Sequence, residues 1–271
     1  MLPVVAFHSK SKRGGRRRLI CVVKDMAWWL HCLPCGIFLA APYLIPRLLG
    51  RIIIEGKAHL ELLPPQRENV LFVANHPSMV DAHIITTAIS WPAYCWNPNL
   101  FLWQTPDKKT FRWVIPLIPY GRYVVVRKDA SGRRNDSGAY RKLLKILPRA
   151  PVLIFPEGGR SRNAVKERGV CYKTVSGIEL GYPRLGVGGL IEATNPWVVP
   201  ILLKGVEAYH PIERRFPNFF APPHMRLIIG RPIRGLDLLI GLTPSDGRKH
   251  NIRFLYADAV IREIVKLDSA P

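Results

Sequence analysis

Acidic residues are scarce in this chain, with 19 Asp and Glu against 40 Lys and Arg and a formal charge of +21 at pH 7. The basic residues recur along the whole chain, and only Lys10 to Arg18 forms a dense run. A charge of this size favours polyanionic partners such as nucleic acid, anionic lipid or a phosphorylated substrate. Because the basic residues form no helix-turn-helix, zinc-finger or RNA-recognition pattern, we expect no nucleic acid among the partners.

Cysteine is also sparse, with five residues in 271, which excludes a disulfide scaffold in a chain of this length. Cys32 and Cys35 have the spacing of a redox or zinc motif, but no second ligand pair accompanies them. We interpret both as ordinary positions of an apolar stretch and expect no metal site. The sequence has no internal repeat, and its 48% apolar residues suffice for one sizeable core.

Formal charge is absent from Met26 to Pro46, a run of 21 residues. About 20 apolar residues are enough to span a bilayer, but Pro34 and Pro42 interrupt this run. Because a broken helix in lipid leaves backbone groups without partners, we favour an interfacial or re-entrant segment. A spanning helix, a buried core segment and a cleaved signal peptide stay open as alternatives. Basic residues that suit anionic lipid flank the run on both sides: Arg13, Arg16, Arg17, Arg18, Lys24, Arg47 and Arg51.

After residue 50 the pattern becomes that of an α/β domain. Short runs rich in Val, Ile and Leu suit strands that are covered on both faces, and they occur at 51–55, 70–74, 123–126, 152–155, 198–203 and 225–229. Helical periodicity predicts helices at 78–90, 137–147 and 252–264, and the Pro-rich stretches 91–106 and 211–223 are predicted to be loops. The alternation predicts an α/β fold with a mainly parallel central sheet flanked by helices. We therefore divide the chain into a basic leader with a membrane-associating helical segment, 1–49, and an α/β domain, 50–271.

The segment NHPSMVD, from Asn75 to Asp81, follows an apolar strand candidate and precedes a helix candidate. It therefore lies at the carboxyl end of a strand, where open α/β sheets bind ligands. Pro77 and Ser78 form a turn that can direct His76 and Asp81 into one cleft. An imidazole beside a carboxylate is suited to take a proton from an alcohol. The alternative is a helix start in which both residues only cap and pack.

The segment FPEGGRSR, from Phe155 to Arg162, also comes directly after a strand candidate. Two glycines beside Glu157 let the backbone approach a ligand closely, and Arg160 and Arg162 can bind a phosphate through two donors each. The alternative is a Gly-rich turn with solvated arginines. No Gly-x-Ser-x-Gly elbow surrounds Ser78, so we expect no serine nucleophile.

Together the two segments resemble the glycerol-phosphate and lysophosphatidate acyltransferase family, which has an NHxxxxD box followed by an FPEGxRS box. His76 and Glu157 are 81 residues apart, as the order and spacing of these boxes require. Further blocks match in order over roughly residues 50–235: Gly121 to Arg127, the RLGVGG turn at Arg184 to Gly189, Val198 to Ile201, and Ile229 to Ile233.

The resemblance implies direct acyl transfer, in which His76 activates an acceptor hydroxyl and Asp81 orients and charges His76. The hydroxyl attacks an acyl thioester of coenzyme A or acyl-carrier protein without an acyl-enzyme, and no cofactor is needed. The acceptor is expected to be a lysophospholipid, most simply lysophosphatidate, in phospholipid synthesis. The implied substrate-binding residues, with Arg160 on the phosphate and Pro200 shaping the cleft, are Asn75, Arg122, Glu157, Gly158, Gly159, Arg160 and Pro200.

The resemblance also implies association with an anionic phospholipid membrane, with the active site on the cytoplasmic side. Residues 163–182 form a longer connection than is usual in the family, so Lys173 and Arg184 are both candidates for a second phosphate contact. Another lysolipid or hydroxylated lipid stays open as acceptor. The non-enzymatic alternatives are a basic nucleic-acid-binding protein, which the charge alone supports, and a membrane scaffold without activity, against which the intact His76, Asp81 and Glu157 argue. Large apolar residues could line an acyl groove, although we favour ordinary core for them: Phe101, Leu102, Trp103, Phe111 and Trp113.

Deletion of residues 1–50 should weaken binding to anionic liposomes, because it removes the apolar run and its basic flanks. Co-sedimentation with liposomes measures this effect. Unchanged binding would contradict the predicted anchor.

Overall fold

The computed structural model describes residues 37, 40–97, 100–106, 122–126, 137–211, 217–240 and 251–269. In this part of the chain the main sheet has the strand order β1-β7-β6-β2-β3, and β8 pairs with β6 off this path. The strands are β1 (Ile52–Glu55), β2 (Val70–Ala74), β3 (Val152–Ile154), β6 (Trp197–Lys204), β7 (Met225–Ile229) and β8 (Ile233–Arg234).

Parallel pairing dominates the centre of the sheet. β2 is parallel to both β3 and β6, and β1 is parallel to β7. β7 and β8 each run antiparallel to β6. The predicted mainly parallel α/β fold is therefore confirmed.

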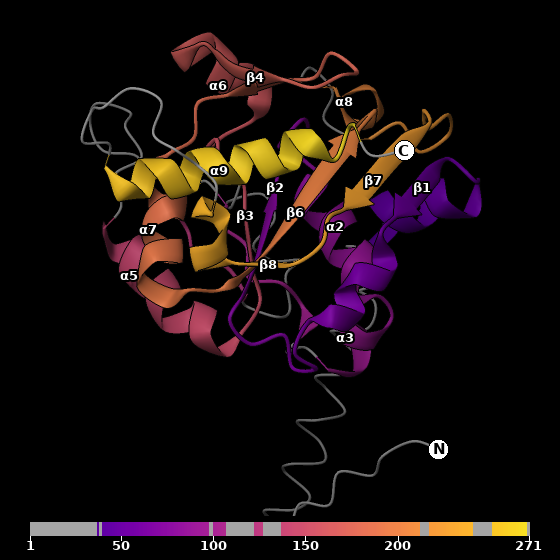
Figure 1. The fold of residues 1–271 in the computed structure, drawn as a ribbon. Helices are drawn as coiled ribbons and strands as arrows, with labels where there is room; N and C mark the ends of the chain where they lie inside the picture. Colours follow the sequence, from indigo (N-terminus) through magenta and orange to yellow (C-terminus); the bar gives the residue numbers. More distant parts are fainter. Residues whose placement is uncertain are drawn as a thin grey trace, which may run out of the picture.

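Helices cover both faces of the sheet (Figure 1). α5 (Ser137–Ile146), α7 (Leu185–Thr194) and α9 (Ile252–Lys266) share one core with alternate β2 residues Leu71 and Val73. The 3-10 helix η1 (Lys57–Leu62), α2 (Asp81–Ser90) and α8 (Val206–Tyr209) share the other core with Val70, Phe72 and Ala74. Because successive side chains of a strand point to opposite faces, the unbroken apolar run of β2 fills both cores.

We call one edge of the sheet the site edge, because the NHPSMVD and FPEGGRSR segments follow strands β2 and β3 there. β2, β3 and β6 run parallel and end there. Lys204, the last residue of β6, pairs with Arg226 near the start of antiparallel β7, so β7 and its parallel neighbour β1 begin at the same edge. The opposite edge carries η1 after β1, and the 3-10 helix η5 (Gly235–Leu239) after β8.

Most predicted elements are present within a few residues of their expected bounds, but four corrections are needed. The predicted strand at 123–126 is wrong, because Tyr123 forms only an isolated bridge to Gln104. The predicted RLGVGG turn is instead the start of α7, with Arg184 as its N-cap residue. The connection after FPEGGRSR contains α6 (Ser161–Arg168) and a separate hairpin of β4 (Val170–Lys173) and β5 (Glu179–Gly181). The predicted loop at 91–106 contains the short helix α3 (Ala93–Trp96).

Most of the predicted membrane-associating segment lies outside the described residues. Residues 40–48 are helical, and Tyr43 and Leu44 pack on the core that contains α2. Among the described residues, no helix combines the length and the apolar character that crossing a bilayer requires. Since the helix at 40–48 belongs to the core, a deletion that ends before residue 37 tests the anchor while keeping the core contacts of Tyr43 and Leu44.

Close contact between α7 and α9 explains one of the glycines at the start of α7, Gly188. A Cβ at Gly188 would lie 1.8 Å from the carbonyl oxygen of Arg253, so only glycine fits against this backbone. Gly186, in the same helix, has no atom within 4 Å of the position of an added Cβ.

Gly188→Ala should lower the free energy of unfolding by about 1–3 kcal/mol, because the added methyl group forces α7 away from α9. Gly186→Ala is the matched control and should leave stability unchanged or raise it by up to about 1 kcal/mol through helix propensity. Urea denaturation measures both. Equal effects of the two substitutions would contradict the close approach of these helices.

Candidate active site

His76 and Asp81 form a pair at the site edge, where the chain leaves β2 and enters α2. The imidazole Nδ1 lies 2.7 Å from Asp81 Oδ2, and the Asp81 carboxylate is fully buried. The backbone N–H of Ser78 donates to Oδ2 at 2.8 Å, and the Ser78 hydroxyl donates to Oδ1 at 2.5 Å. With Nδ1 held by the carboxylate as a donor, the lone pair of the imidazole lies on Nε2.

A ring stack fixes the plane of the imidazole. The rings of His76 and Phe155 are 4.0 Å apart between centroids and only 12° from parallel. Phe155 opens the FPEGGRSR segment, so the two predicted segments meet directly. The His76 side chain stays 19% exposed, which leaves the ring open to a substrate.

A second histidine near Asp81 has a different environment. His83 lies in α2, two residues after Asp81, and burial lowers its pKa to about 4 although the Asp81 charge opposes the change. No described residue accepts from or donates to its Nδ1. His83 is therefore neutral near pH 7, and it is His76 that pairs with the carboxylate.

Ser161 joins the two predicted segments, and the candidate residues read from the sequence did not include it. Its hydroxyl accepts from the His76 backbone N–H at 3.1 Å and donates to Glu157 Oε2 at 2.5 Å. Its own N–H donates to the His76 carbonyl at 2.9 Å. Both the N–H and the carbonyl of His76 are thus bonded to Ser161, which holds the loop that carries the imidazole against the start of α6.

Ser78 was also missed as a site residue, although a sequence signal for it exists. A Ser followed three residues later by an acidic residue before an apolar run is typical of a helix start. Ser78 and Asp81 have this spacing, and the Ser78 N–H donates to Asp81 as the signal predicts. The Ser78 hydroxyl also donates to the carboxylate, and the N-cap residue of α2 is Val80.

The carboxylate of Glu157, which was predicted to hold the acceptor, is turned into the protein. Oε1 accepts from the Gly181 N–H at 2.7 Å, Oε2 is bonded to Ser161, and the side chain is buried. Burial raises the pKa of Glu157, while the hydrogen bonds from Ser161 and Gly181 oppose this effect. Glu157 positions the loop around His76 and the hairpin that contains Gly181.

Two further predicted substrate-binding residues also have structural contacts instead. The Asn75 side chain is buried and pairs with the Leu203 backbone, donating to its carbonyl at 2.9 Å and accepting from its N–H at 2.8 Å. Pro200 is buried in the middle of β6 and pairs with Val73, the second-last residue of β2. Asn75 therefore ties the end of β2 to β6, and Pro200 belongs to the sheet rather than to a cleft.

The glycines and arginines of FPEGGRSR lie where three helices begin. Gly158 has φ +67°, and a Cβ there would lie 2.7 Å from Arg184 Cγ, so Arg184 packs directly over this turn. Arg160 is the N-cap residue of α6, and Gly159 precedes it. Lys173 faces Glu179 across the hairpin at 3.5 Å, and Arg184 faces Glu167 at 3.7 Å. Of the two phosphate candidates, Arg184 is the one that packs over the Gly158 turn.

The starts of α2, α6 and α7 are joined to these loops. Asp81 begins α2, the N–H of Ser161 in α6 reaches the His76 carbonyl, and the N–H of Arg184 reaches the Pro156 carbonyl at 2.8 Å. Because the N-terminal end of a helix carries partial positive charge, this arrangement favours an anionic ligand.

Arg122 lies beyond β3, next to the strand-like residues 103–104. Its guanidinium is 5.6 Å from the Trp103 ring centroid, and burial lowers its pKa. Gly121 and Arg127 of the predicted basic block, and Phe111 and Trp113 of the predicted groove, lie outside the described residues. Phe101 and Leu102 are buried among neighbouring apolar side chains, so for these two the ordinary-core interpretation is confirmed.

Comparison with known proteins agrees with this geometry. The model of the family described as Acyltransferase matches residues 51–204, more than half of the chain. The chain belongs to this acyltransferase family. The matched residues include both His76 and Glu157 with their surrounding segments.

Two relatives carry more specific names. A curated 1-acyl-sn-glycerol-3-phosphate acyltransferase from Chlamydomonas reinhardtii is 31% identical over 127 residues, which are 45% of this chain and 31% of the relative. The match therefore spans about a third of that relative's length. The crystal structure of the 1-acyl-sn-glycerophosphate acyltransferase PlsC from Thermotoga maritima has a TM-score of 0.52 at 17% identity, covering 92% of this chain and 84% of that one. At this identity the second match shows a shared fold.

The raised pKa of Glu157 predicts a pH-dependent stability. The folded state holds the Glu157 proton more tightly than the unfolded chain, so the unfolded chain loses this proton first as pH rises. The free energy of unfolding should therefore fall by up to about 1.4 kcal/mol per pH unit between the unfolded and folded pKa values. Glu157→Gln cannot ionise and should lack this fall.

Urea denaturation over a pH series, from about 4.5 upward, measures the slopes of the two proteins. Glu179→Gln, on the exposed side of the hairpin, is the control and should keep the wild-type slope. Identical slopes in wild type and Glu157→Gln would contradict the assigned environment.

Proposed function

We propose that this protein transfers an acyl group from acyl-CoA or acyl-carrier protein to the hydroxyl of a lysophospholipid, most simply lysophosphatidate. The observation that carries the proposal is the buried Asp81 carboxylate bonded to His76 Nδ1, with the ring partly open to solvent. This pair suits a base that takes a proton from an alcohol. Family membership and the name of the algal relative support the choice of reaction and acceptor.

The proton path follows from the tautomer of His76. Nε2 takes the proton of the acceptor hydroxyl while the hydroxyl oxygen attacks the thioester carbonyl carbon. The imidazolium that forms is stabilised by the adjacent Asp81 carboxylate. When the tetrahedral intermediate collapses, the carbon–sulfur bond breaks and the leaving thiolate takes the proton from Nε2. No enzyme nucleophile and no cofactor takes part.

Binding of the acceptor phosphate is assigned to the basic residues near the starts of α6 and α7. Arg160 caps α6 and Arg184 packs over Gly158, so both lie on the loops that hold His76. Arginine can bind a phosphate through two parallel donors, and the helix starts add partial positive charge. The net charge of +21 suits an anionic substrate embedded in an anionic membrane. We place the protein at such a membrane, with its active site facing the cytoplasm.

His76→Ala should lower the rate of acyl transfer from acyl-CoA to lysophosphatidate by about 100-fold or more, because it removes the general base. Asp81→Asn should also lower the rate, since the imidazolium loses its partner. Transfer of a radiolabelled acyl group measures both effects. Equal rates in wild type and His76→Ala would show that His76 is not the base.

His59→Ala is the matched control, because His59 lies on η1 at the opposite edge, where its side chain bonds to the Ile229 carbonyl at 2.9 Å. It should retain the wild-type rate. Thermal denaturation of each variant distinguishes a lost base from a lost fold.

A further inference from the structure

Two apolar side chains stand almost fully in solvent on separate loops. Val175, between β4 and β5, is 80% exposed, and Phe220, in the loop before β7, is 100% exposed. An isolated exposed apolar residue has no special meaning. Val175 and Phe220 are of interest because both lie at the site edge.

Contacts at the tip of the hairpin place Val175 at the site edge. The N–H of Ser176 donates to Asp268 Oδ2 at 2.6 Å, and Asp268 also forms an ion pair with Lys204, the last residue of β6. Gly181 at the other end of the hairpin donates to Glu157. The hairpin is therefore tied both to the loop around His76 and to the end of β6.

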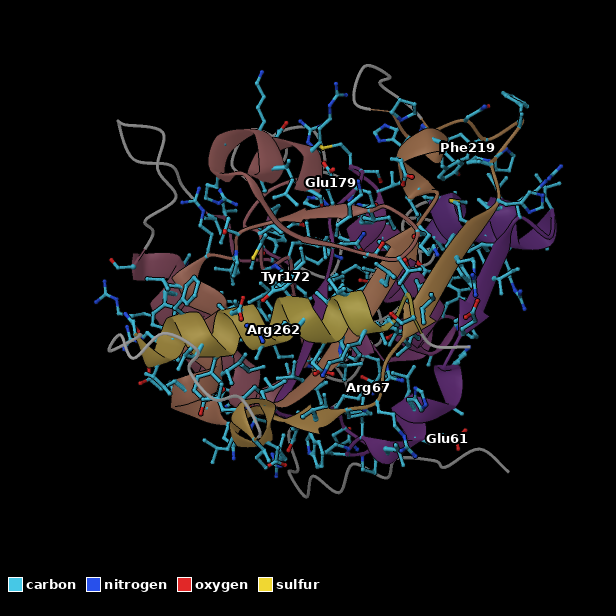
Figure 2. The ribbon with its side chains drawn as sticks, turned by 45° about the horizontal axis from the view of Figure 1, so that its top comes forward. Glu61, Arg67, Tyr172, Glu179, Phe219 and Arg262 are labelled. Atoms are coloured by element: carbon cyan, nitrogen blue, oxygen red, sulfur yellow. The ribbon has the colours of Figure 1, made fainter. Side chains whose placement is uncertain are left out.

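The loop with Phe220 lies at the same edge. It precedes β7, whose residue Arg226 pairs with Lys204. Figure 1 shows the hairpin strand β4 at the top of the molecule and α8 with the start of β7 beside it. Figure 2 places Phe219 and Glu179 toward one end of the molecule, far from Glu61 on η1.

Both side chains are held outward by ordered neighbours. The hairpin turn is closed by bonds from the Thr174 N–H to the Ile178 carbonyl at 2.9 Å and from the Gly177 N–H to the Thr174 carbonyl at 3.0 Å. Phe219 packs edge-on against buried Tyr209, with ring centroids 6.1 Å apart, so its neighbour Phe220 faces solvent. Their exposure is thus a property of the fold, and it leaves apolar area uncovered at the site edge.

Charge near the hairpin indicates what covers these residues. Residues 160–184 contain six basic and two acidic side chains, within a chain of charge +21. Apolar tips among basic residues are typical of surfaces that insert into the headgroup region of an anionic bilayer. An acidic protein partner would match the basic charge, but Phe220 would be fully exposed to solvent whenever that partner is not bound.

We propose that Val175 and Phe220 insert into an anionic bilayer, so that the site edge faces the lipid. A lysolipid acceptor can then reach His76 without leaving the membrane completely. The role of this surface in acyl transfer rests on the proposed function, but its contact with lipid can be tested without any acyl transfer.

Photocross-linking tests the location directly in the full chain. The photoreactive amino acid p-benzoylphenylalanine is placed at position 175, at position 220 or, as control, at position 240. Ile240 is 76% exposed and follows η5 at the opposite edge, so it matches Val175 in exposure. With vesicles of phosphatidylcholine and phosphatidylglycerol, mass spectrometry should find lipid adducts at 175 and 220 and none at 240. No adducts at 175 and 220, or equal adducts at all three positions, would overturn the proposal.

Enzyme assays separate this proposal from the proposed function. The double variant Val175→Asp and Phe220→Asp should lose about tenfold or more of its activity on lysophosphatidate embedded in vesicles, since two charged side chains replace the inserted ones. It should keep wild-type activity on a short-chain, water-soluble lysophosphatidate. Ile240→Asp should keep both activities. Equal loss on both acceptors would assign the two residues to the active site and overturn the membrane role, whereas an inactive wild type would contradict only the proposed function.

Discussion

The buried carboxylate of Asp81 is the constraint on which the site depends. A carboxylate without water is costly unless donors surround it, and removing one partner of a buried charge leaves the other uncompensated. Here both donors of Ser78 and the imidazole of His76 satisfy it. The turn between β2 and α2 must therefore keep one shape, and that shape directs the imidazole toward the substrate side. Stability and reactivity at this point come from the same set of hydrogen bonds.

Ser161 extends this constraint to the second segment. Its hydroxyl and N–H bond to the N–H and the carbonyl of His76. A shift of the α6 start therefore moves the imidazole as well. Glu157 in turn holds Ser161 and Gly181, so the buried acid acts on the reaction through the loop rather than on the substrate. The two motifs thus behave as one structural unit, although 81 residues separate His76 from Glu157.

Much of the fold followed from the sequence because the central strands are buried on both faces. The apolar run at 70–74 was predicted to be a strand covered on both faces, and the five buried residues of β2 confirm it. The start of α7 was misread as a turn because its glycines indicate flexibility when seen alone. For Gly188 the reason is the backbone of Arg253 in α9, a contact that a single sequence cannot show. The run at 123–126 was equally apolar, yet it forms only an isolated bridge.

The site shows the same limit at the level of side chains. Spacing and residue type identified His76 and Asp81 and placed them together, since a short turn leaves few ways to arrange a pair five residues apart. Asn75 and Glu157 lie beside the predicted site, but their side chains bond to protein atoms, because a motif shows which residues gather and not which way they point. Both are polar residues whose bonds go to distant backbone, at Leu203 and Gly181.

The connection after FPEGGRSR shows why extra chain length at an active site need not be a loose loop. The hairpin supplies the Gly181 N–H to the carboxylate that positions Ser161, and the Ser176 N–H to Asp268 beside the end of β6. A segment held at both ends in this way keeps the orientation of its tip fixed relative to the imidazole. Whatever surface contacts Val175 is therefore held in a defined relation to His76. The position of His76 and the orientation of the hairpin tip therefore depend on one network of hydrogen bonds. In this network Asp81 and Glu157 hold the loop with His76, and the hairpin holds Val175 at the surface.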